Sequence, residues 1–168
     1  MRRLPSWKGF RVRTVRQVAL LGLLLAPLCS NARASQSYHP RNDASRIQRL
    51  VDRIRHALAL DHNVTVEIVA SNPLLASVEP VAGHAGAFRL LLEDAFIDQL
   101  NDEELHAVVA HELGHVWVFT HHPYLQTELL ANQIAMRVVS RDTLQRVYSK
   151  VWARGGAKGD LVQFLGND

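Results

Sequence analysis

Hydrophobic residues recur at intervals of three and four positions across residues 44–60, and mainly charged residues occupy the positions between them. This period predicts an amphipathic helix with one buried face. The pattern changes at residues 64–69, where alternation and β-branched side chains predict a strand. Residues 71–87 hold prolines and glycines without a clear period and predict a loop or a hairpin, and residues 88–93 predict a second strand.

The second half of the chain is predicted to be helical. A short helix at residues 94–100 is followed by Asn101 and Glu104, which have the spacing of a helix-capping box, and the helix that they begin extends to residue 119. Two strands among many helices predict an α+β domain, with a small β-sheet packed on a mainly helical body. Further helices are predicted at residues 124–140, 142–154 and 161–165.

The helix at residues 105–119 is hydrophobic on nearly every side, which is typical of a buried helix. The polar side chains that interrupt it are His106, His111, Glu112 and His115. A buried carboxylate without a partner costs several kcal/mol, so Glu112 needs a cationic neighbour. A divalent metal ion and its bound water would provide one.

The segment HELGH at residues 111–115 has the spacing of a metal site. Two histidines four positions apart on a helix share one face, so both imidazoles can reach one ion. Glu112 stands on the flank of this face and would act as a general base on a metal-activated water rather than as a ligand. Gly114 leaves room beside the site for a substrate or a strand to approach. We therefore expect one Zn²⁺ per chain, with His111 and His115 as ligands.

A catalytic zinc site takes a third protein ligand and keeps one position open. Glu128 is one candidate, because the thirteen positions after His115 leave room for a turn at Pro123 and the start of an antiparallel helix. His121 is the other candidate, because its position six residues after His115 resembles that of the third histidine in metzincins. That arrangement has a glycine for a sharp turn where this chain has Val118, which disfavours the turn. The pattern favours Glu128 and leaves His121 open.

Other polar residues near these candidates have predicted supporting roles. Asn132 lies one turn after Glu128, and its amide oxygen could accept the free ring N–H of a ligand histidine. A group that stabilises the developing oxyanion is also expected. The candidates for that group are His121, His122, Tyr124, Arg137 and Tyr148.

These motifs resemble those of a known family. Residues 107–115 (AVVAHELGH), together with Glu128 and Asn132 in the segment ELLAN, are similar to the gluzincins, the zincin metallopeptidases of the HtpX and CAAX prenyl protease type. The resemblance covers roughly residues 60–140. It implies a zincin-like fold with a buried active-site helix, endopeptidase activity, Glu128 as a zinc ligand and an edge strand at residues 88–93. The chain departs from the family at Asn132, where an aspartate is usual.

The N-terminal region has the features of a secretory signal peptide in the usual order: a basic start, an apolar run at residues 18–28 and the small residues of Ala32-Arg33-Ala34. We predict a signal peptide at residues 1–34 and a zincin-like metallopeptidase domain at residues 35–168, periplasmic or secreted after cleavage near Ala34. The apolar run is shorter than the roughly 20 residues that a membrane span needs. No stable span is therefore expected in the mature chain, while an uncleaved anchor and membrane association stay open.

Loss of this segment changes the charge of the chain. Residues 1–34 hold seven of the 19 basic residues and none of the 16 acidic ones, so 12 basic and 16 acidic residues remain, a net charge of −4. The sequence pI of 9.4 describes the precursor and gives no reason to expect nucleic acid binding. Cys29 is the only cysteine, so a metal in the mature chain must use histidine and carboxylate ligands.

The sequence thus predicts a zinc-dependent endopeptidase of a bacterial-type cell envelope, which hydrolyses polypeptides with a zinc-activated water and with Glu112 as general base. The alternative from another functional class is a catalytically silent zincin-fold module that binds peptides or a partner. A third interpretation is a structural zinc site that both His121 and Glu128 close.

Overall fold

The computed structural model describes residues 44–125, 127–155 and 159–167. The predicted signal peptide at residues 1–34 lies outside these ranges, so it stays a prediction. Within the described ranges, no helix combines the length and the apolar character that crossing a membrane requires.

A sheet of three strands forms one layer of the domain. Its strands are β1 (Asn63–Val69), β2 (Ala76–Pro80) and β3 (Ala87–Glu93), in the order β1-β3-β2. β1 runs parallel to β3, whereas β2 and β3 form an antiparallel pair, so the hairpin alternative for residues 71–87 is confirmed. The expectation that residues 88–93 form an edge strand is wrong, because β3 pairs on both sides and is the central strand. β2 is the edge strand on that side of the sheet.

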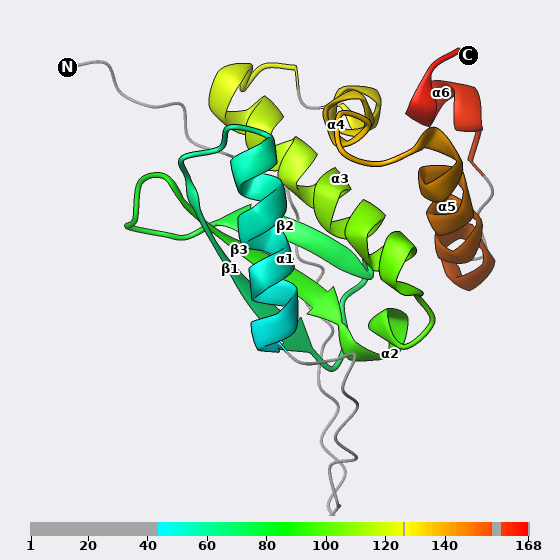
Figure 1. Cartoon of the computed structure of the whole chain (residues 1–168), viewed down its shortest axis with the longest axis horizontal. Coiled ribbons are helices and arrows are strands. Elements are labelled where there is room, and N and C mark those ends of the chain that lie inside the picture. Colours follow the sequence, from blue (N-terminus) through cyan, green and yellow to red (C-terminus); the bar gives the residue numbers. More distant parts are fainter. Residues whose placement is uncertain (1–43, 126, 156–158, 168) are drawn as a thin grey trace, which may run out of the picture. The chain divides into compact units, whose positions relative to one another are not determined.

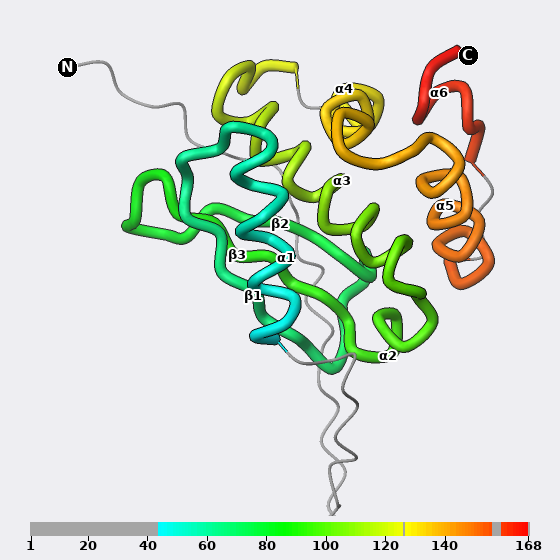
Figure 2. Tube along the Cα trace, viewed as in Figure 1, coloured from blue at the N-terminus to red at the C-terminus, as the bar shows by residue number. Residues whose placement is uncertain are grey.

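Helices form the second layer and cover one face of the sheet. Helix α1 contacts β1 and helix α3 contacts β2, while α4 and α5 pack against α3 away from α1 (Figures 1 and 2). This arrangement confirms the predicted α+β class with a small sheet on a mainly helical body. The helices are α1 (Ala44–Ala57), α2 (Asp94–Ile97), α3 (Asp102–His121), α4 (Glu128–Ala135), α5 (Arg141–Gly155) and α6 (Leu161–Leu165).

The two faces of β3 show why the sheet is covered on one side. Phe88, Leu90 and Leu92 are buried beneath the helices. Arg89 projects from the opposite face, where it forms ion pairs with Glu67 of β1 and Glu79 of β2 and remains half exposed. Alternation along a strand separates an apolar face from a polar one, and here the charged face is left to solvent.

Helix α3 is the central element of the domain. The side chain of Asn101 accepts the Glu104 backbone N–H at 2.9 Å, and the Glu104 carboxylate accepts the Asn101 N–H at 2.8 Å, which confirms the capping box. The helix continues two residues beyond the predicted end. It ends at His121 because the residue before a proline avoids helical backbone angles, and that residue is His122.

Helix α4 is shorter than the predicted helix at residues 124–140. Its N-cap is Thr127, whose hydroxyl accepts the Leu130 backbone N–H at 3.1 Å. This cap starts the helix at Glu128 rather than at Tyr124. The late start places Glu128 at the first helical position, where α4 approaches the middle of α3.

Candidate metal centre

Helix α3 presents His111 and His115 side by side. Their Nε2 atoms are 3.1 Å apart, and their rings meet edge to face with centroids 4.7 Å apart. The positions before and after them, such as Ala110 and Leu113, are fully buried, so the backbone that carries the imidazoles is held within the core. Because four residues make about one helical turn, this spacing brings both Nε2 atoms to one point, as predicted.

Helix α4 brings Glu128 to the same point. The Oε2 atom of Glu128 is 3.3 Å from His111 Nε2, and its Oε1 atom is 3.5 Å from His115 Nε2. The donor atoms of the three residues all lie within 4.8 Å of one another. The structure thus brings together the three residues that the sequence analysis favoured as ligands.

The donor separations match the geometry of one tetrahedral ion. Zinc bonds to nitrogen and oxygen of about 2.0–2.2 Å would separate neighbouring donors by about 3.3–3.6 Å around a tetrahedron. The separations of 3.1, 3.3 and 3.5 Å agree with that range within a few tenths of an ångström. Two imidazoles and one carboxylate also make up a donor set that zinc uses in catalytic sites. The residues present therefore fit a metal ion.

His121, the rival third ligand, lies elsewhere. Helix α3 runs straight through Val118 to His121, so six residues turn the side chain by about 240° from the direction of His115. The ring of His121 stacks on Trp117 at 4.1 Å, and its Nδ1 atom lies 2.9 Å from the Trp117 carbonyl. His121 is not in the group of three donors.

Gly114 has a different role from the one expected. A Cβ atom on Gly114 would lie 2.3 Å from the carbonyl oxygen of Ala131, so the missing side chain makes room for the backbone of α4 and not for a substrate. The small residue Ala131 completes this close crossing. The crossing is what brings Glu128, three positions earlier on α4, to the two histidines.

Glu112 interacts electrostatically with all three donor residues and is only 6% exposed. Burial raises the pKa of Glu112 above its ordinary value. His111, His115 and a hydrogen bond to the backbone of Val78 lower this pKa, but burial outweighs them. Val78 belongs to β2, so the edge strand reaches the carboxylate. A carboxylate with a raised pKa is a stronger proton acceptor than an ordinary one.

The three donors also shape the charge of the site. Hydrogen bonds from His111 and His115 hold the pKa of Glu128 far below its ordinary value, although burial opposes this. Burial would lower the pKa of His111, but the hydrogen bond to Glu128 and the charges of Glu112 and Glu128 raise it on balance. Two carboxylates in a half-buried site therefore favour a cation between the imidazoles.

The oxyanion candidates lie in three different places. Tyr148 is buried, and its hydroxyl lies 3.5 Å from Glu128 Oε2 and 2.7 Å from the amide nitrogen of Asn132. Its hydroxyl is thus already engaged by these two residues. Arg137 lies over the ring of Trp117 at 5.0 Å. The other candidates, His121, His122 and Tyr124, lie at the exposed C-terminal end of α3 or in the loop after it.

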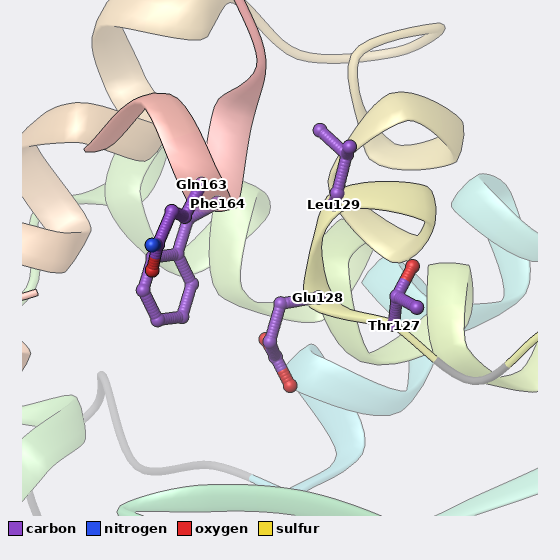
Figure 3. A pocket seen from close by; sticks show the side chains of 5 residues that line it. All are labelled: Thr127, Glu128, Leu129, Gln163 and Phe164. Carbon is purple, nitrogen blue, oxygen red and sulfur yellow. The ribbon is translucent and has the colours of Figure 1, made fainter. Parts of the chain in front are cut away.

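A hollow of about 380 Å³ opens beside Glu128, between the start of α4 and the helix α6. Figure 3 shows Glu128 and Leu129 on one side of it and Gln163 and Phe164 on the other. Thr127, the N-cap of α4, also lines it. Glu128 itself is 48% exposed, so the donor group is open to solvent from this direction.

Two features of this site were not predicted from the sequence. The approach of β2 to Glu112 was not expected, because residues 76–80 have too short a run to distinguish them from a loop. The contact of Phe164 in α6 with Asn132 was also not expected, since 32 positions separate them. The short hydrophobic group of α6 was the available signal, but it does not indicate which helix α6 would cover.

Comparisons with known proteins identify a family and a similar structure. The sequence profile described as "Peptidase family M48" matches residues 41–166, which is most of the chain. The crystal structure of the metallopeptidase zymogen of Pyrococcus abyssi abylysin is similar over 68% of this chain and 99% of that chain, with 17% identity and a TM-score of 0.48. No curated protein matches the sequence. Because this profile match covers most of the chain, the chain belongs to peptidase family M48 and is a metallopeptidase of that family.

Proposed function

We propose that the protein is a zinc-dependent endopeptidase in which His111, His115 and Glu128 hold one zinc ion and Glu112 acts as the general base. One observation carries this proposal: the buried carboxylate of Glu112 lies beside three donor atoms whose separations suit a single tetrahedral ion. Within the described ranges, this is the one group of three histidine, cysteine or acidic side chains with such spacing.

The chemistry divides between the ion and the protein. Zinc, when bound, polarises the scissile carbonyl and lowers the pKa of water. Glu112 accepts the proton of the attacking water and returns it to the leaving amine. The burial of Glu112 keeps its pKa raised, which suits both transfers. His111 and His115 must be neutral at Nε2 to act as ligands.

The substrate binds as an extended chain at the free edge of β2. β2 pairs with β3 along one side, and the backbone of Val78 on this strand reaches Glu112. Main-chain hydrogen bonds to an edge strand bind a polypeptide with little dependence on its sequence. A chain added at this edge would pass next to the general base, which supports a polypeptide substrate rather than a small molecule.

The protein acts outside the cytoplasm, in the periplasm or beyond it, after cleavage of the signal peptide near Ala34. The basic start and the apolar run of residues 1–34 support this part of the proposal. The net charge of −4 on residues 35–168 gives no reason to expect a nucleic acid partner.

Cleavage of an unfolded protein by the full chain tests the proposal. We expect Glu112→Gln to keep its zinc and to lose cleavage by about 100-fold or more, because a positioned base contributes at least that much. His106→Gln is the matched control, since this half-buried histidine shares α3 but lies outside the donor group. Unchanged cleavage in Glu112→Gln would contradict the proposal. Zinc binding without cleavage in the wild type would favour the silent binding module.

A further inference from the structure

Asn132 is a fully buried amide that contacts three other helices. Its Oδ1 atom lies 2.8 Å from His111 Nδ1 on α3. Its amide nitrogen donates to the hydroxyl of Tyr148 on α5 at 2.7 Å and to the backbone carbonyl of Phe164 on α6 at 2.9 Å. One side chain thus links a candidate metal ligand to the last two helices of the chain.

The partner on α6 decides which way the amide faces. An asparagine amide can be turned over, which exchanges its oxygen and its nitrogen. A backbone carbonyl only accepts hydrogen bonds, so the Phe164 carbonyl requires the NH₂ group of Asn132 on its side. The oxygen must then face His111, and His111 must donate from Nδ1. In the neutral ring this leaves Nε2 without a proton, toward His115 and Glu128.

We propose that α6 and Tyr148 are positioning elements of the metal centre. The carbonyl of Phe164 and the hydroxyl of Tyr148 fix the orientation of the Asn132 amide, and Asn132 in turn keeps the proton of His111 on Nδ1. The part of this proposal that concerns the metal rests on the proposed function. An aspartate at position 132 could also accept from His111, but it could not donate to Phe164, which gives a reason for an amide here.

Several contacts hold α6 in place. Leu165 is 2% exposed, and the Arg141 guanidinium donates to the carbonyls of Leu165 and Gly166 at 2.8 and 2.6 Å. The ring of Phe164 packs against Tyr148 and Trp152, with centroids 5.1 and 6.0 Å apart. The carbonyl that orients Asn132 therefore belongs to an anchored segment. The hydroxyl of Tyr148 also lies 3.5 Å from Glu128 Oε2, which connects the same network to a second candidate ligand.

The tautomer of His111 can be read directly from the metal-free full chain. Long-range ¹H–¹⁵N correlation spectra of protein labelled at histidine, recorded at alkaline pH, distinguish a proton on Nδ1 from one on Nε2. We expect a proton on Nδ1 of His111, whether or not Nε2 also carries one toward Glu128. A His111 ring without a proton on Nδ1 would overturn the proposal. This measurement involves neither zinc nor substrate, so its outcome is independent of whether the protein cleaves polypeptides.

Two variants test the links from α5 and α6. In Asn132→Asp, we expect the proton to stay on Nδ1 while hydrogen exchange of the amides in residues 161–166 becomes faster, because the Phe164 carbonyl loses its donor. In Tyr148→Phe, we expect the zinc Kd to rise by about 10-fold, as for other residues that orient a ligand. Trp152→Phe is the matched control, because it changes the same aromatic cluster without touching the hydrogen bonds, and its zinc Kd should change less than about twofold.

The opposite results would overturn the proposal. Unchanged exchange of residues 161–166 in Asn132→Asp would mean that α6 does not depend on the amide. Equal zinc Kd values for Tyr148→Phe and Trp152→Phe would mean that the hydroxyl of Tyr148 only fills the core. In that case the network satisfies buried polar groups and has no part in positioning His111.

Discussion

Gly114 of α3 and Ala131 of α4 cross backbone to backbone: a methyl group on Gly114 would lie 2.3 Å from the Ala131 carbonyl oxygen. Protein backbones rarely tolerate such an approach unless one residue has no side chain. The crossing decides how far the start of α4 lies from the imidazoles of α3. The glycine within the HELGH segment is thus part of the fold that brings Glu128 to the site.

Gly114→Ala is expected to push α4 away from α3. The free energy of unfolding should fall by about 1–3 kcal/mol, as for other overpacked cores, and zinc should bind more weakly because Glu128 moves with α4. Chemical denaturation and a zinc titration measure the two effects. Gly155→Ala is the matched control, since a Cβ atom at Gly155 meets nothing within 4 Å. Equal stability and equal zinc affinity in both variants would show that the crossing does not position Glu128.

Removal of the metal is expected to destabilise the protein. A ligand that binds only the folded chain stabilises it by about 2.7 kcal/mol at 100 times its Kd, so a chelator should lower the Tm of the wild type by several degrees. Added zinc should restore it. In His115→Ala the chelator should have little effect, because one of the three donors is missing. A thermal melt with and without chelator checks this, and an equal response of both proteins would contradict the proposed ligand role of His115.

The ion pair of Glu104 and Lys150 predicts a pH-dependent stability. Burial alone would raise the pKa of Glu104, but hydrogen bonds from Lys150 and the Asn101 backbone, with the charges of Lys150 and Arg146, lower it on balance. A pKa lowered by folding adds stability that is fully present above the unfolded value of 4.5 and is lost as the pH falls through the folded value. Lys150→Met should therefore lower the free energy of unfolding by about 1–3 kcal/mol near neutral pH and by less in acid.

Urea unfolding of the wild type and of Lys150→Met, at neutral pH and below the unfolded pKa of Glu104, measures this difference. Arg46→Met is the control, because the pair of Arg46 with Asp102 is far more exposed. It should change the free energy of unfolding by less than about 1 kcal/mol at either pH. If Lys150→Met lowers the free energy of unfolding equally at both pH values, the lowered pKa assigned to Glu104 is contradicted.

Local patterns in the sequence predict those parts of the fold that depend on neighbouring residues. The period of α1, the capping box at Asn101 and the spacing of His111 and His115 all arise within one or two helical turns, and the structure agrees with each. The burial of α3 also followed from its apolar composition, because a helix that is hydrophobic on every side has no polar face for contact with solvent.

Features that depend on how distant elements meet were harder to predict. The spacing alone did not decide between His121 and Glu128, because that choice depends on the crossing of α3 and α4. The family resemblance implied an edge strand at residues 88–93, whereas the short strand at residues 76–80, which ends at Pro80, makes β3 the central one. The link from Asn132 to Phe164 needs the tertiary fold, since no local pattern relates residues 32 positions apart.

The zinc content of single variants tests the metal centre most directly. Wild type, Glu128→Ala and His121→Ala are purified as full chains, and zinc per chain is measured after dialysis against a weak chelator. We expect about one zinc ion per chain in the wild type and in His121→Ala, and a large loss of zinc in Glu128→Ala. Retention of zinc by Glu128→Ala together with its loss from His121→Ala would contradict the ligand set of His111, His115 and Glu128.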